Sequence, residues 1–133
     1  MVKNIQEYYQ CIMDNLTGGL ISVDMGGKVV YINPTAGQVL HIEDIPACLD
    51  KKYESAFENF PALKNVIYET IESGKTVRRA EISIMHASTP LIIGYSTMHV
   101  RGANGKEMGV TVIFQDISFV GAKKSHEQKT QSA

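Results

Sequence analysis

The sequence has no tryptophan, only two cysteines and no long apolar run. Cys11 and Cys48 are too few and too far apart for a disulfide framework or a zinc-binding pattern. No stretch approaches the roughly 18 to 20 apolar residues that a transmembrane helix requires. The first residues lack the apolar core of a signal peptide, so we expect a cytoplasmic location and no membrane contact by this segment. A fragment of a membrane-anchored protein would have the same features.

A strong charge of either sign is also lacking. Thirteen basic and 14 acidic residues leave a formal net charge of -1, so we expect no nucleic-acid partner. The 133 residues suffice for about one domain, and 44% hydrophobic with 20% charged residues is typical of a globular protein. The composition therefore favours one folded domain with a core of ordinary size.

The N-terminal segment carries apolar side chains three and four positions apart. They are Ile5, Tyr8, Tyr9, Ile12, Met13 and Leu16. This stripe predicts an amphipathic helix over residues 3–16, with Asn4 and Glu7 at capping-box spacing. Ile5, Tyr8, Tyr9 and Ile12 are the candidates for a dimer contact. We therefore divide the chain into a capping or dimerisation helix (1–18), a folded core (19–118) and a polar tail expected to be disordered (119–133).

The core alternates strand and helix signals. Segments 20–23 and 29–32 flank a glycine turn and predict a hairpin. Asn33 and Pro34 then suit the N-cap and first position of a helix to residue 40. Short helical turns are expected over 43–49 and 52–57, and an amphipathic helix over 61–73 that Gly74 ends.

The last third of the core predicts strands over 77–86, 91–101 and 107–115, joined by turn-forming residues. Strands on both sides of a helical block predict an α+β fold. We expect a five-stranded antiparallel sheet with the helices across one face and a cavity between the two layers.

Three stretches carry a family resemblance: Gly19 to Asp24 (GLISVD), Gly27 to Ala36 (GKVVYINPTA) and Val110 to Ser118 (VTVIFQDIS). In this order and spacing, the segment from about Tyr9 to Ser118 resembles a PAS domain, the sensory module of bacterial histidine kinases and related signalling proteins. The resemblance implies a PAS fold and a regulatory role in signal transduction, including two-component systems.

Asp116, Ile117 and Ser118 occupy the place where such domains pass a signal from the last strand to an output segment. The residues that follow Ser118 lack a heptad pattern, and no output domain is recognisable. The resemblance therefore leaves two alternatives open: an excised fragment with an altered tail, or a different coupling to the output.

PAS domains bind haem, flavin, covalent chromophores, small acids or nothing. Haem sensors of this family take a histidine on or near the helix before the third strand, and segment 61–74 has none. Cys48 lacks the neighbours of a flavin-reactive cysteine, and we expect a small buried hydrophobe there and an incidental role for Cys11. The motifs support neither haem nor flavin nor a metal, which leaves a small organic ligand or none.

Pocket-lining candidates come from strands and helices expected to face the cavity. They are Tyr31, Tyr68, Met85, Ile93, Tyr95, Met98 and His99, although such residues are also typical of an ordinary core. Alternation along 91–98 leaves open which set faces inward, and Gly94 could admit a ligand or mark a bulge. We expect His99 to be half-exposed beside Thr97 and Arg101. Arg78 and Arg79 could bind a carboxylate bidentately, but a strand edge predicts solvated charges.

Two other function classes remain as alternatives. A pocket enzyme of the ketosteroid-isomerase type would need a carboxylate and a hydroxyl donor in an apolar cavity, for which Asp24, Asp116, Tyr31 and Tyr95 supply the side chains. No nucleophile elbow, phosphate loop or kinase signature is present, so we predict no catalytic residue and no turnover by this chain. A ligand-free interaction module, most simply a homodimer, is the other alternative.

Overall fold

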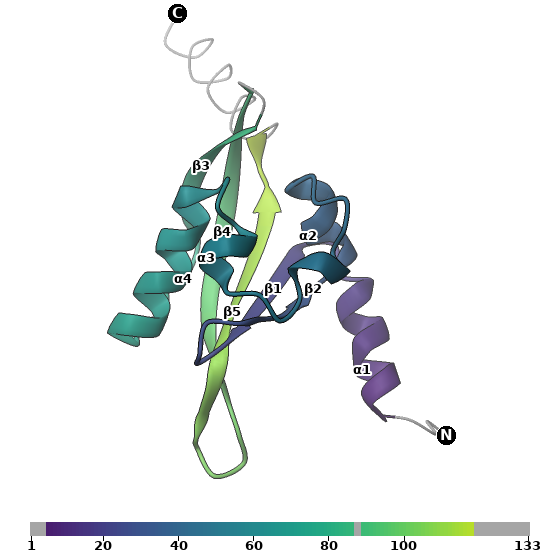
Figure 1. Cartoon of the computed structure of the whole chain (residues 1–133), viewed down its shortest axis with the longest axis vertical. Coiled ribbons are helices and arrows are strands. Elements are labelled where there is room, and N and C mark those ends of the chain that lie inside the picture. The colour runs from purple at the N-terminus through teal and green to yellow at the C-terminus, as the bar shows by residue number, and fades with distance from the viewer. Residues whose placement is uncertain (1–4, 87–88, 119–133) are drawn as a thin grey trace, which may run out of the picture.

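The computed structural model describes residues 5–86 and 89–118. Its helices and strands follow one another in a single series (Figure 1). They are α1 (Ile5–Asp14), β1 (Gly19–Asp24), β2 (Val29–Ile32), α2 (Pro34–Val39), the 3-10 helix η1 (Pro46–Cys48), α3 (Tyr53–Ala56), α4 (Pro61–Ser73), β3 (Ala80–His86), β4 (Thr89–Arg101) and β5 (Glu107–Asp116). The expected Asn4 cap and the expected tail over 119–133 lie outside the described residues.

The five strands form one antiparallel sheet in the order β2-β1-β5-β4-β3. The last strand in the chain therefore lies in the middle of the sheet, between the first strand and the fourth. This arrangement joins the front hairpin to the late strands, because Ile21 pairs with Val112 and Tyr95 pairs with Phe114. The expected α+β fold with a five-stranded antiparallel sheet is confirmed.

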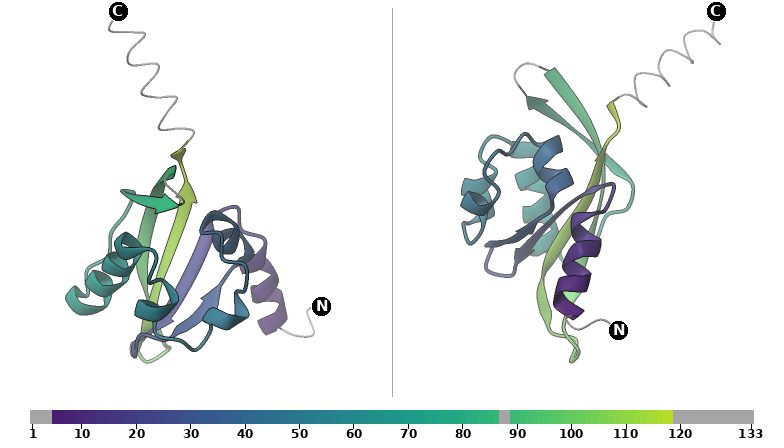
Figure 2. Two further views of the ribbon diagram at one scale, coloured as in Figure 1. Left: turned by 45° about the horizontal axis from the view of Figure 1, so that its top comes forward. Right: turned by 90° about the vertical axis from the view of Figure 1, so that its right-hand side faces the viewer.

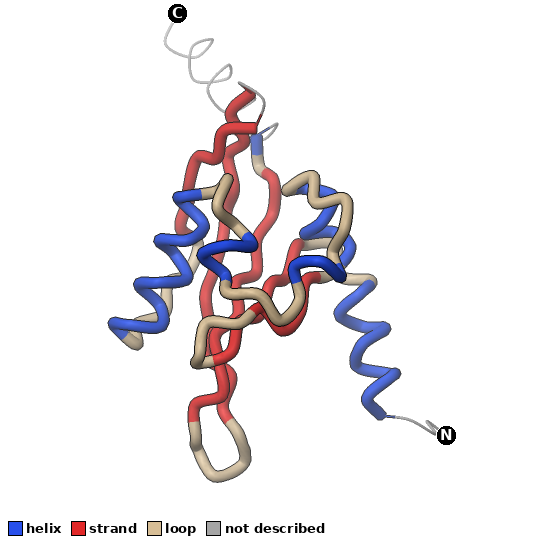
Figure 3. The backbone as a smooth tube through the Cα atoms, viewed as in Figure 1, coloured by secondary structure: helices blue, strands red, loops and turns tan. Residues whose placement is uncertain are grey.

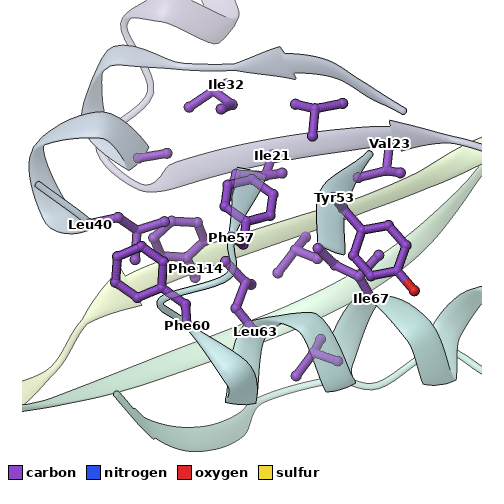
Figure 4. Packing of buried hydrophobic residues seen from close by; sticks show 14 of the residues in the cluster. Ile21, Val23, Ile32, Leu40, Tyr53, Phe57, Phe60, Leu63, Ile67 and Phe114 are labelled. Atoms are coloured by element: carbon purple, nitrogen blue, oxygen red, sulfur yellow. The ribbon is translucent and has the colours of Figure 1, made fainter. Parts of the chain in front are cut away.

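Helices α2 to α4 cover one face of this sheet, and α1 lies apart from them beside β2 (Figures 1 and 2). The core forms between the sheet and the helical layer, where side chains from both layers interlock (Figure 4). Phe57 at the end of α3 and Ile67 of α4, with Ile21 and Val112 from the sheet, are each at most 1% exposed. Burying a side chain of this kind stabilises a fold by about 1.5–3 kcal/mol, so this interface holds the domain together.

Asn33 connects the front hairpin to α2. Its side-chain oxygen accepts the N–H of Ala36 at 2.9 Å, which is the N-cap contact expected from the Asn-Pro pair. The same oxygen accepts the N–H of Leu20, and the amide nitrogen donates to the carbonyls of Met13 and Gly18. All four bonding positions of this fully buried amide are used, and they join α1, β1, β2 and α2.

Helix α4 begins at a proline and ends where Gly74 adopts a left-handed φ of 70°. Its buried stripe is Leu63, Val66, Ile67 and Thr70, as the three- and four-residue spacing predicts. In the segment before it, the two predicted helical turns are present but shorter, as η1 and α3. The long helix packs on β3 and β5 of the sheet.

The third strand begins later than the sequence predicts. It starts at Ala80 rather than at residue 77, because Arg79 has a left-handed φ of 54° that interrupts an extended strand. The N–H of Val77 instead donates to the Thr97 hydroxyl at 2.9 Å. Residues 74–79 therefore form a loop along the edge of β4. This loop is coloured tan in Figure 3.

Candidate functional site

Alternate residues of β4 face the helices. Ile93 and Thr97 are buried at 2% and 5% exposure, whereas Met98 on the opposite face is 47% exposed. Tyr95 lies between the two buried residues. The pKa of its hydroxyl is raised above the ordinary value, mainly by burial and to a smaller extent by the charge of Glu69. The alternation that the sequence left open is thus resolved with Ile93, Tyr95 and Thr97 inward.

The space between the sheet and the helices is almost filled. Its lining is apolar and consists of Leu40, Leu63, Val66, Ile82, Ile84, Ile93, Tyr95, Val112 and Phe114. It offers only about 10 Å³ in which the centre of a water molecule fits. That volume is near the lower limit for a single water, so side chains fill nearly all of the core in this packing.

Only Ile93 and Tyr95 of the predicted pocket residues line this core cavity. Tyr68 is 49% exposed on α4, Met85 is 60% exposed, and Met98 lies on the outer face of the sheet. Tyr31 also lies away from the core cavity, because it is the residue of β2 that contacts α1. The predicted set is therefore dispersed over several surfaces.

His99 has a more specific environment than its sequence context suggests. Its side chain is only 5% exposed, so the expectation of a half-exposed ring is wrong. The end of α4 covers it, because its Nε2 lies 2.8 Å from the carbonyl oxygen of Gly74. A carbonyl only accepts hydrogen bonds, so Nε2 carries a proton, while the buried Nδ1 has no hydrogen-bond partner among the described residues.

The residues required for an isomerase-like site do not converge. Asp24 accepts the N–H of Lys28 in the hairpin turn, and Asp116 is exposed and accepts the N–H of Ser118. Tyr31 contacts Asp14 at the other side of the sheet, while Tyr95 is in the core. The two carboxylates thus have local structural roles and neither lines the apolar cavity.

The cysteines and histidines show no metal centre within residues 5–86 and 89–118. Cys11 is exposed on α1. Cys48, expected to be a small buried hydrophobe, is partly buried against the core, and this burial raises the pKa of its thiol. A raised pKa keeps the thiol protonated, which disfavours it as a nucleophile.

The end of β5 is fastened to β4 by specific bonds. The N–H of Ile117 donates to the carbonyl of Ile92 at 2.8 Å, and the N–H of Ile92 donates to the Ser118 hydroxyl at 2.8 Å. The Ile117 side chain packs over Gly94, where an added Cβ would lie 3.4 Å from its Cδ1 atom. We call Asp116, Ile117 and Ser118 the exit segment. Sequence reasoning located this segment but missed its two partners in β4, although Gly94 was a visible signal.

Helix α1 keeps its predicted apolar stripe uncovered. Ile5, Tyr8, Tyr9 and Ile12 are 53%, 49%, 56% and 47% exposed, and no residue of this helix is buried. Three polar contacts hold its C-terminal end and the next turn: Tyr31 hydroxyl to Asp14, Asn33 amide to Met13 carbonyl, and Thr35 hydroxyl to Leu16 carbonyl. These contacts attach the C-terminal end of the helix to the domain.

Comparison with known proteins places these features in a family. The sequence profile of the PAS fold matches residues 7–117, which include every strand of the sheet. The chain belongs to the PAS family. PAS domains are sensory modules of signalling proteins and are generally non-catalytic.

This PAS domain is 25% identical over 122 residues to the signal transduction histidine-protein kinase AtoS of Escherichia coli K12. The match covers 92% of this chain but only 19% of AtoS. The PAS domain of Bordetella pertussis BvgS shares the fold with a TM-score of 0.68 at 18% identity, covering 96% of this chain and 99% of that one. A PAS domain from Colwellia psychrerythraea has a TM-score of 0.62 at 14% identity, covering 86% and 98%.

The PAS match agrees with the resemblance seen in the sequence motifs, including their association with histidine kinases. No helix among the described residues of this PAS domain is long and apolar enough to span a bilayer.

Proposed function

We propose that this PAS domain is a regulatory module that self-associates and relays a change in its packing through β5 to an output segment. The observation that carries the proposal is the attachment of the exit segment to β4. Two backbone hydrogen-bonding groups of Ile92 hold Ile117 and Ser118, so a shift between β4 and β5 changes the direction in which the chain leaves the sheet. The similarity to AtoS supports an output of the histidine-kinase kind.

The uncovered stripe of α1 supports self-association. An amphipathic helix is stabilised mainly by covering its apolar face, and in this chain Tyr8, Tyr9 and Ile12 of α1 remain exposed. Met98 and Ile113 add exposed apolar side chains on the outer face of the sheet, at 47% and 36% exposure. A second copy would cover both surfaces, and a C2 pair would bring the same residues together twice.

The filled core supports a relay that depends on packing. A resident haem or flavin between the helices and the sheet would require the side chains around the roughly 10 Å³ cavity to move apart. We therefore infer that the purified domain is colourless and that dimer packing, rather than a cofactor in the core, supplies the two states. The free thiols Cys11 and Cys48 support a reducing compartment, which is the cytoplasm.

Sedimentation velocity and amide exchange on the 133-residue chain test the proposal together. Tyr9→Glu with Ile12→Glu places two charges on the stripe of α1, and we expect a dimer to become a monomer. Gln10→Glu with Glu7→Gln, on the same exposed helix, exchanges polar groups and should leave the dimer intact.

The relay requires that the monomeric variant exchange the amides of Ile92 and Ile117 at least several-fold faster than the dimer. Equal exchange in dimer and monomer would contradict the relay. A wild-type chain that sediments as a monomer at high concentration would contradict the self-association.

A further inference from the structure

We propose that the loop between α4 and β3 and the adjoining edge of β4 form a binding site for a small anion with at least two carboxylate or phosphate groups. We call this site the arginine cleft and define it by Thr76, Arg78, Arg79, Ser96, His99 and Arg101, all of which line it. The cleft offers about 590 Å³ to the centre of a water molecule, against about 10 Å³ in the core cavity. Its size falls within the range of small-molecule sites.

Positive charge concentrates in this cleft although the whole chain has a net charge of -1. Arg78, Arg79 and Arg101 line it together, and no carboxylate does. Among the described residues, neither Arg78 nor Arg79 forms an ion pair. Guanidinium groups bind carboxylate and phosphate oxygens through paired N–H donors, so unpaired arginines around one cleft fit an anionic ligand.

The carboxylate of Glu107 approaches Arg101 and His99, but it binds them weakly. Its Oε1 lies 3.9 Å from Arg101 Nη2 and 4.0 Å from His99 Nδ1. Both distances exceed a hydrogen bond, and Glu107 and Arg101 are 43% and 60% exposed. Exposed pairs of this kind contribute little, so Arg101 is available to a ligand.

The loop that carries the first two arginines is held in place on both sides of Arg78. Val77 exchanges two hydrogen bonds with Thr97, one through the threonine hydroxyl and one through its N–H. The N–H of Arg79 donates to the Ser96 hydroxyl at 3.2 Å. Binding loses less conformational entropy when the binding groups are already held, so this loop is suited to ligand capture.

Arg79 also has a left-handed φ of 54°. Neighbouring residues of an extended strand point to opposite faces, and the left-handed residue interrupts that alternation, which lets both arginines line one cleft. A non-glycine residue in this conformation is uncommon and stores strain that functional sites often retain. A glycine at this position would relieve the strain but remove the charge.

The spacing of the charges selects a ligand with more than one anionic group. Arg79 is joined to β4 at Ser96, and Arg101 follows Ser96 by five positions, roughly 16 Å along an extended strand. Because long arginine side chains can extend from both ends toward the middle of this row, a di- or trianion placed between them can contact both, whereas a monoanion contacts one. His99 fixes the inner wall between them, because its Nε2 holds the Gly74 carbonyl at the end of α4.

Titration of the full chain with citrate and, separately, with pyrophosphate tests this site, with acetate as the monoanion control. The titrations are done at low ionic strength, because salt screens exposed charges. We expect amide shifts confined to residues 76–79 and 96–101 in nuclear magnetic resonance spectra. Binding of citrate alone assigns a carboxylate ligand, and binding of pyrophosphate alone assigns a phosphate ligand. If acetate binds as tightly as the better of citrate and pyrophosphate, the proposal that the ligand carries more than one anionic group is overturned.

Arg78→Gln with Arg79→Gln should weaken that binding by about tenfold or more, since each lost charge-assisted contact is large. Arg101→Gln alone tests the far end of the cleft and should also weaken it. Lys28→Gln with Lys51→Gln removes the same net charge from exposed positions elsewhere and should change affinity less than about twofold. The site is overturned if neither probe binds. It is also overturned if the arginine variants bind as tightly as wild type, or if the lysine variant loses as much affinity as they do.

Met98 and Ile113, which the proposed dimer covers, also line this cleft. The titrations are therefore repeated on the monomeric Tyr9→Glu, Ile12→Glu variant, in which the cleft is open whatever the state of the relay. Absence of binding in that variant overturns the site independently of the proposed function.

Discussion

The side-chain oxygen of Asn33 accepts the backbone N–H of Leu20 at 2.9 Å, across thirteen positions of sequence. This bond belongs to the set of four in which the buried amide joins both strands of the front hairpin to α1 and α2. A residue recognised in the sequence as a helix cap is therefore also the polar centre of the N-terminal half of the domain. Its neighbours depend on it, because buried polar groups without partners are costly.

Asn33→Ala should lower the free energy of unfolding by about 3 kcal/mol or more, since it removes a cap and leaves several buried backbone groups unpaired. Urea denaturation followed by circular dichroism measures this loss. Asn15→Ala is the matched control, because Asn15 is exposed and its side-chain amide donates to the Cys11 carbonyl. We expect the control to lose less than about 1 kcal/mol. Equal losses for the two variants would contradict the central role of Asn33.

Tyr31→Phe should loosen α1 and change the response of stability to alkaline pH. Burial raises the pKa of Tyr31 well above its usual value, and the hydrogen bond and charge of Asp14 raise it further. The folded chain therefore keeps this proton more tightly than the unfolded chain does. The contribution of Tyr31 to stability is fully present below its unfolded pKa of about 10 and is lost as pH rises above that value.

Thermal denaturation of wild type and Tyr31→Phe from neutral to alkaline pH checks this sign. The difference in stability should be constant up to about pH 10 and then shrink. Tyr53 and Tyr95 also have raised pKa values through burial, but both variants share them, so the comparison isolates Tyr31. A difference that grows with alkaline pH would contradict the assignment.

Much of the fold was predictable because its signals are local. The glycine turn, the Asn-Pro helix start and the apolar spacing over 61–73 each depend on neighbouring residues, and the structure has all three elements. The family motifs then joined the hairpin to the late strands. The sheet order itself, with β5 between β1 and β4, is a long-range property that no single segment determines.

The candidate site was less predictable because its determinants are distant in sequence. Both sets of alternate residues in 91–98 contain apolar side chains, so periodicity did not identify the inward set. The burial of His99 depends on where α4 ends. The strand predicted from residue 77 begins only at Ala80 because of the backbone conformation of Arg79, which composition does not reveal. The predicted pocket residues Tyr68, Met85 and Met98 are apolar or aromatic in character, but their exposure was decided by helix and strand placement.

Gly74→Ala tests how firmly α4 is closed against β4. Gly74 has a φ of 70° and nothing within 4 Å of an added Cβ, so the only cost is backbone strain. We expect a loss of about 1 kcal/mol in the free energy of unfolding, with the fold retained. Chemical denaturation measures the loss, and the matched control is Glu72→Ala, at an exposed position of the same last turn. A neutral Gly74→Ala would contradict the left-handed helix end.

Gly94→Val tests whether the close packing of Ile117 holds the exit segment. An added Cβ would already lie 3.4 Å from Ile117 Cδ1, so two further methyl groups should displace the Ile117 side chain and weaken both bonds to Ile92. Overpacking of this kind costs about 1–3 kcal/mol. In hydrogen exchange, the amide of Ile117 should exchange about tenfold faster or more. The exchange rates of core amides such as that of Val112 should change little or decrease.

The double variant Gly94→Val with Ile117→Ala separates crowding from a general defect of β4. If the two side chains compete for the same space, the smaller residue at 117 should recover part of the stability lost in Gly94→Val, and the two effects will not add. Strict additivity would mean that the valine disturbs the strand without touching the exit segment. Recovery would instead show that position 94 controls how the chain leaves the sheet, which is the contact through which a relay along β5 would reach an output.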